Sequence, residues 1–251
     1  MKKILAFIAG LTLVFSLVTS VSAQSSNQSS NAVIPEKNGD YPEPKHPGVR
    51  VRVFVHEPKT QTNITSATCS PDDPSDAVVH PAGWHLPSGN WQYSLSVSSV
   101  PSSVSDISSV AANAFNVWQS AQNKVTFSRT SDTTKTRSSY DRQNIIAWGR
   151  TKGTALAVTY TRYLTSTREA VDVDTIFNKR FQWTWSTGSC SNAYDAQDIL
   201  THELGHWMGL EDEYTSNYVN NTMYGYGSTA EIKKNSLTYG DILGVQAIYP
   251  L

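Results

Sequence analysis

Two histidines one helical turn apart constrain the fold of this chain more than any other feature. His202 and His206 enclose Glu203 in the pattern H-E-x-x-H, which places both imidazoles on one face if the segment is helical. Two neutral imidazole nitrogens in that arrangement suit a zinc ion. Glu203 lies beside the same face, where a carboxylate can take a proton from a metal-bound water and pass it to a leaving amine. The segment therefore predicts a helix that carries a hydrolytic zinc site.

The third zinc ligand is expected just beyond this helix. Gly209 follows three residues after His206, and a residue without Cβ allows the helix to end and the chain to turn back. The segment resembles the metzincin motif H-E-x-x-H-x-x-G-x-x-H at every fixed position except the last, where Asp212 replaces histidine. The snapalysin-like branch of the metzincins also has aspartate there, so the resemblance implies that Asp212 is the third ligand. Glu211 and Glu213 are the alternatives for this role.

The sequence around the motif decides whether it is more than a chance match. Asp195 can cap the helix, and Asp198 adds a second carboxylate at its positive end. Residues 221–225 resemble the metzincin Met-turn, a tight turn that places a methionine, here Met223, beneath the metal site. A methionine by itself would more often fill a core. Helix, turn and Gly209 together favour a metzincin-type zinc site.

The order of the expected elements resembles a matrixin catalytic domain over residues 83–251. Helical spacing over residues 107–121, after a capping box at 103–106, predicts a long amphipathic helix. Thr238 and Asp241 can form a second capping box, at the start of a final helix. Alternation predicts strands at residues 92–97, 125–128, 144–148, 155–161 and 170–177. The resemblance implies an α+β fold with a twisted mixed five-stranded sheet and a substrate antiparallel to its edge strand, which we assign to 155–161.

The start of the chain predicts secretion. Lys2 and Lys3 precede an apolar run, and residues 21–23 offer small side chains for signal peptidase, so residues 1–23 are expected to be a signal peptide. A membrane anchor is the alternative, but the run is short for a span. After cleavage we expect a secreted, extracellular protein that is monomeric and not bound to a membrane.

The next segment, residues 24–75, differs in composition from the rest of the chain. Residues 24–48 are polar and are expected to be disordered or loosely attached. Residues 49–55 alternate as a strand does. The segment is interpreted as a short propeptide or an edge element, and the metalloprotease domain is expected over residues 76–251.

The chain has two cysteines, Cys69 and Cys190. A disulfide between them is the default for a secreted chain with one pair. The alternative is a cysteine switch, as in matrix metalloproteinases, in which a propeptide thiolate occupies the open zinc position. The sequence around Cys69 lacks the full switch motif, which favours the disulfide.

Charge and histidine placement limit the other partners. The chain carries 20 basic and 21 acidic residues, which gives no basic field for nucleic acid. No histidine lies between the first expected helix and the zinc helix, so one catalytic zinc is expected, without the second, structural zinc of vertebrate matrixins. Asp172, Asp174 and Asn178 lie where matrixins have oxygen ligands for calcium. Alternating acidic residues on an exposed strand face are the competing explanation.

The sequence thus predicts a zinc-dependent endopeptidase that acts on a protein or peptide substrate. Zinc is assigned to His202, His206 and Asp212, and the general base to Glu203. Tyr224 or Tyr226 is a candidate donor to the developing oxyanion, although aromatic packing explains both equally well. Two other classes remain open: a non-proteolytic zinc amide hydrolase and a catalytically silent zinc-containing binding module.

Overall fold

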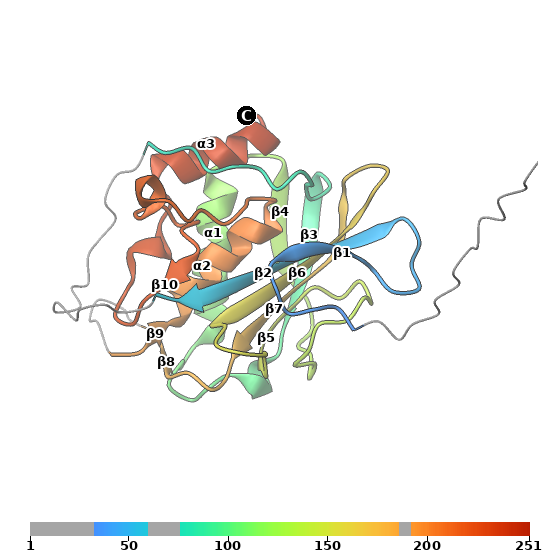
Figure 1. Ribbon diagram of the computed structural model, residues 1–251. Coiled ribbons are helices and arrows are strands. Elements are labelled where there is room, and N and C mark those ends of the chain that lie inside the picture. The colour runs from blue at the N-terminus through green and yellow to red at the C-terminus, as the bar shows by residue number, and fades with distance from the viewer. Residues whose placement is uncertain (1–32, 60–75, 186–191) are drawn as a thin grey trace, which may run out of the picture. The chain divides into compact units, whose positions relative to one another are not determined.

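The computed structural model of the chain describes residues 33–59, 76–185 and 192–251. Its main sheet has the strand order β1-β2-β6-β7-β5-β3-β4, and β10 joins it by pairing with β2 (Figure 1). The strands of this sheet are β1 (Gly39–Pro42), β2 (Val49–Pro58), β3 (Gly89–Leu95), β4 (Val125–Arg129), β5 (Ile145–Gly149), β6 (Ala157–Leu164), β7 (Ala170–Asn178) and β10 (Tyr226–Gly227). A second, two-stranded sheet pairs β8 (Trp183–Thr184) with β9 (Tyr194–Asp195).

The sheet is mixed, as predicted. The pairs β3–β4, β3–β5 and β5–β7 are parallel. The pair β6–β7 is antiparallel. Each of the five predicted strands is present within a few residues of its expected bounds. The α+β fold with a twisted mixed sheet is therefore confirmed.

The assignment of β6 as the edge strand is wrong in this structure. Strand β2 pairs antiparallel with β6 from Val49 to His56, and β1 pairs with β2 beyond it. Alternate side chains of a strand share one face of the sheet. Val51 and Val53 of β2 lie on the same face and are buried there in a core cluster with Val158. The apolar half of β2 thus explains why the sheet extends past its expected five strands.

The expectation of a disordered or loosely attached segment at residues 24–48 is also wrong for the part that the structure describes. Residues 39–42 form β1, and the Glu43 carboxylate accepts from Arg162 Nε of β6 at 2.9 Å. This ion pair is almost fully buried. Residues 1–32 and both cysteines lie outside the described residues, so the signal peptide, the disulfide and the cysteine switch stay predictions.

In the part of the chain that the structure describes, three α-helices accompany the sheet: α1 (Ile107–Ser120), α2 (Ala196–Trp207) and α3 (Tyr239–Ile248). Figure 1 shows α1 and α2 side by side on the same face of the sheet, and Trp118 of α1 donates its indole N–H to the Thr201 carbonyl of α2 at 2.8 Å. Short 3₁₀ helices lie at Val97–Ser99, Ser216–Tyr218 and Lys233–Asn235. No helix in the described ranges has the length and apolar character that a bilayer span needs.

The two predicted capping boxes have different outcomes. The box at residues 103–106 is wrong: α1 begins later, with Asp106 as its N-cap accepting from the Ser109 amide at 3.1 Å. A turn closed by the Val104 amide and the Pro101 carbonyl occupies the preceding residues. At α3 the predicted box is present, with Thr238 and Asp241 bonding each other's backbone N–H.

Candidate metal centre

Helix α2 positions both histidines of the motif and buries them. Its N-cap, Asp195, accepts from the amides of Gln197 and Asp198 at 3.0 Å each, which satisfies donors that would otherwise lack partners. After the helix, Gly209 has a φ of 92°, and a Cβ there would lie 2.5 Å from the Trp84 carbonyl oxygen. Only glycine fits this turn, so the chain reverses where the sequence predicted.

The reversal brings Asp212 to the two histidines. Its Oδ1 lies 3.1 Å from His202 Nε2 and 3.4 Å from His206 Nε2, and its side chain is 4% exposed. Two ligands of a tetrahedral zinc, each about 2.0–2.1 Å from the metal, lie roughly 3.4 Å apart. The spacing of the three atoms therefore suits one zinc ion.

The second nitrogen of each ring fixes which atom is free for a metal. Nδ1 of His202 lies 2.8 Å from the Thr222 carbonyl, and Nδ1 of His206 lies 2.9 Å from the Leu210 carbonyl. A carbonyl only accepts, so each Nδ1 carries a proton, and Nε2 of the neutral imidazole is then the atom with a lone pair for a metal. Burial also lowers the pKa of His202 to about 4, which keeps that ring neutral.

These lone pairs show that the residues fit a cation. Nε2 of both histidines and Oδ1 of Asp212 are buried and have no hydrogen-bond partner. Two lone pairs and a carboxylate oxygen facing one another repel unless a positive ion lies between them. The donor set is one that zinc accepts.

The neighbouring acids are turned away from this point. Glu211 Oε2 accepts from Arg52 at 2.6 Å, and Glu213 Oε1 lies 2.6 Å from Nδ1 of His80. The structure therefore brings together the predicted trio and neither alternative acid. Asp212 has its other oxygen, Oδ2, bound by the Tyr214 hydroxyl at 3.1 Å, a contact that sequence reasoning missed.

The predicted Met-turn lies directly under α2. Met223 is fully buried, and a Cβ on Gly205 would lie 2.1 Å from its sulfur, so the glycine provides the room that the methionine fills. The Asp241 carboxylate of the α3 cap accepts from the amides of Thr222 and Met223, at 2.9 and 3.2 Å. The same Thr222 supplies the carbonyl that holds His202.

Glu203 lies next to the metal centre without joining its donor atoms. Its Oε2 accepts from the Thr159 hydroxyl of β6 at 2.6 Å, and its Oε1 lies 3.2 Å from Nδ1 of His56. The carboxyl is fully buried, and this burial raises the pKa of Glu203 to about 7. A group with such a pKa both accepts and releases a proton near neutral pH.

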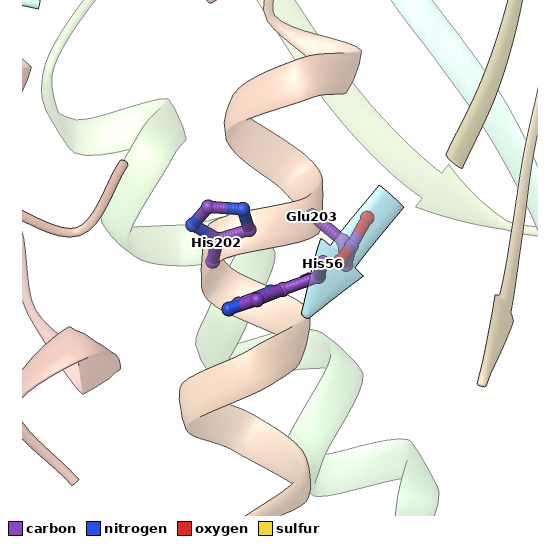
Figure 2. A group of neighbouring side chains, drawn as sticks. All are labelled: His56, His202 and Glu203. Carbon is purple, nitrogen blue, oxygen red and sulfur yellow. Dashed lines mark hydrogen bonds and ion pairs between the residues drawn. The ribbon is translucent and has the colours of Figure 1, made fainter. Parts of the chain in front are cut away.

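A second group of side chains comes from β2 and was not foreseen. His56 lies beside His202 and Glu203 (Figure 2), and these three also have atoms close enough to hold a metal in the described part of the chain. Phe54 stacks on His206 with ring centroids 3.8 Å apart. The alternation of residues 49–55 could have shown that Phe54 and His56 share a face, but not which element that face would cover.

The residues proposed for calcium have another role. Asp172 and Asp174 both bind the guanidinium of Arg162, at 2.7 and 3.1 Å. Asp172 also accepts from the backbone amides of Asp141 and Arg142. These contacts use the carboxylate oxygens that calcium would need, so the structure does not support calcium there.

The comparison with known families agrees with this site. The family model described as matrixin matches residues 84–250, which contain α2, Asp212 and the Met-turn. No curated protein matches the chain significantly. The model spans well over half of the chain, so this protein belongs to the matrixin family of metalloproteases.

Proposed function

We propose that this matrixin is a zinc-dependent endopeptidase, with zinc held by His202, His206 and Asp212 and with Glu203 as the general base. One observation carries the proposal: three buried, unpaired donor atoms converge on one point, and backbone carbonyls hold the two imidazole rings from behind. A buried carboxyl whose pKa is raised to about 7 lies on the next residue of the helix.

The residues divide the work of peptide hydrolysis between them. Zinc in this site would supply a Lewis acid that polarises the peptide carbonyl and makes water more acidic. The Thr159 hydroxyl orients the Glu203 carboxylate from the side opposite to His56. Glu203 then takes the proton of the attacking water and later delivers it to the leaving amine. Its raised pKa suits both transfers.

The test is the Glu203→Gln variant, which keeps the shape of the side chain but removes its basicity. We expect chelator-sensitive cleavage of casein by the wild-type chain and a loss of about 10²–10⁴-fold in the variant, with zinc content unchanged. Because β2 covers the site and has to leave it before a substrate can bind, we expect slow turnover. Cleavage is therefore followed over hours. Glu169→Gln, remote from the centre, serves as the matched control. Full activity of Glu203→Gln would refute the general-base role, and casein cleavage that survives phenanthroline would refute the metal.

A further inference from the structure

Strand β2 lies on the matrixin domain as an extended peptide lies when it adds to a sheet. It precedes the family match at residues 84–250, yet it pairs antiparallel with β6 and, at Glu57 and Pro58, parallel with β10. The Leu156 amide donates to the His56 carbonyl at 2.7 Å. Adding a strand to a sheet edge is a general way of binding a peptide. On the proposed function, β2 therefore occupies the place of a peptide substrate.

The face of β2 that points inward packs on both histidines of the centre and on Glu203. The Phe54 ring lies parallel to that of His206, and the His56 ring lies 3.9 Å from that of His202 (Figure 2). With β2 in place, His202, Glu203 and His206 have no exposed surface. A substrate can reach them only by replacing β2, so the contacts of β2 show what the site offers to a substrate.

The most specific of these contacts is made by Lys234. Its Nζ lies 3.2 Å from Nε2 of His56 and donates to the carbonyls of Tyr224 and Tyr226, at 2.7 and 3.0 Å. An ammonium has three N–H donors and no acceptor, so two are used by the domain and the third by β2. Lys234 is fully buried. A replacement for β2 that offers no acceptor would leave this third donor unsatisfied, which is costly for a buried charge.

The surroundings of the His56 ring limit the shape of a replacement. A Cβ on Gly227 would lie 3.2 Å from His56 Nε2 and 2.9 Å from the terminal methyl groups of Ile199 and Leu156. The walls are thus close: they are apolar beside Gly227, Glu203 Oε1 lies 3.2 Å from His56 Nδ1, and the Lys234 ammonium lies at the far end of the ring, 3.2 Å from Nε2. A side chain of similar reach with an apolar middle and an acceptor at its tip fits this description. Glutamine and glutamate have that form.

We propose that Lys234 determines the specificity of this peptidase, by selecting peptides whose side chain at the position of His56 is glutamine, glutamate or histidine. As a statement about substrates, the proposal rests on the proposed function. The contact itself is testable without turnover, because β2 makes it within the chain.

The first experiment measures how firmly β2 is held in the full chain. Hydrogen exchange of residues 49–58 is compared between His56→Gln and His56→Leu, with Lys234 present and in the Lys234→Met background. With Lys234 present, we expect exchange of residues 49–58 to be at least tenfold faster in His56→Leu than in His56→Gln. In the Lys234→Met background, we expect exchange to be faster in His56→Gln than in His56→Leu. Equal rates for the two variants with Lys234 present would overturn the proposal, and that comparison stands even if Lys234→Met fails to fold. Arg50, which binds Asp40, provides the control. The difference in exchange rate between Arg50→Gln and Arg50→Leu should be the same with and without Lys234.

The second experiment profiles cleavage of a peptide library by the full chain. The ratio of two cleavage rates does not depend on how often β2 leaves the site, because that fraction is the same for both peptides. We expect glutamine, glutamate and histidine to be preferred at least tenfold over leucine and methionine at one position, and the preference to vanish in Lys234→Met. Cleavage whose preference ignores Lys234 overturns the proposal and leaves the proposed function intact. If the exchange experiment gives the expected pattern but no peptide in the library is cleaved, the proposed function is contradicted, and the substrate assignment with it.

Discussion

At the scale of single residues, each histidine of the centre is set by what its second nitrogen does. The carbonyls of Thr222 and Leu210 take the Nδ1 protons of His202 and His206, and this leaves both Nε2 lone pairs aimed at Asp212. Partners behind a ligand fix its tautomer and orientation and raise metal affinity. Metal binding at the proposed centre is therefore expected to depend on two backbone carbonyls as well as on three side chains.

The Asp212→Ala variant tests the third ligand. Removing Oδ1 leaves two imidazoles, and we expect zinc affinity to fall by more than about 100-fold, which exceeds the usual effect of removing a partner outside the ligand set. Zinc content is measured by mass spectrometry of metals after dialysis. Glu211→Ala is the control, since its carboxylate binds Arg52 and should leave the zinc in place. Equal zinc in wild type and Asp212→Ala would remove Asp212 from the ligand set.

At the scale of elements, the Met-turn and the cap of α3 form one unit. Asp241 accepts from the amides of Thr222, Met223 and Thr238, and it is fully buried. One carboxylate thus closes the start of α3 and holds the turn that carries the carbonyl behind His202. A change at this cap should reach the metal through Thr222.

We expect Asp241→Ala to affect both stability and metal binding. Three buried N–H donors lose their acceptor, which should lower the free energy of unfolding by about 3 kcal/mol or more, and zinc affinity should fall by about 10–100-fold through the freed Thr222 carbonyl. Denaturant unfolding and zinc titration measure the two effects. Asp106→Ala, at the exposed cap of α1, should lower the free energy of unfolding less and leave zinc affinity unchanged. Unaltered zinc binding in Asp241→Ala would disprove the link between the cap and the centre.

Arg162 joins β6 to the neighbouring strand β7 and to the segment after β1. Its guanidinium binds Asp172, Asp174 and Glu43, and the side chain is 4% exposed. Because removing one partner leaves buried charges without compensation, Arg162→Ala should lower the free energy of unfolding by about 3–5 kcal/mol. Thermal unfolding of the wild type and of Arg162→Ala checks this.

Thermal unfolding of the wild type is also measured with and without millimolar calcium. A rise in the wild-type melting temperature on adding calcium, abolished by Asp172→Asn, would contradict the assignment of these carboxylates to Arg162.

At the scale of the whole molecule, local spacing was informative and long-range pairing was not. His202, His206 and Gly209 lie within a few residues of one another, so helical geometry and one glycine turn were enough to predict a third ligand just beyond the turn. The cap of α3 was predictable for the same reason. Each is a statement about neighbours in the sequence. The choice of Asp212 over Glu211 and Glu213 came from the resemblance to the metzincin motif.

The covering of the centre could not be predicted in this way. The alternation of residues 49–55 predicts a strand but carries no information about which edge it joins, and β2 meets β6 about a hundred residues further along the chain. Lys234 stands in a polar stretch with no motif, and its burial depends on Tyr224, Tyr226 and His56 coming together in space. Contacts of this kind follow from the assembled sheet and helices.

The most direct test of the central claim is anomalous diffraction at the zinc edge from a crystal of the full chain grown with zinc. We predict one peak about 2.0–2.2 Å from Nε2 of His202, Nε2 of His206 and Oδ1 of Asp212. Among the described residues, His56, His202 and Glu203 form a second group that could hold a metal, and this group is the alternative position for the peak. A peak among those three, or no peak within reach of Asp212, would contradict the proposed centre.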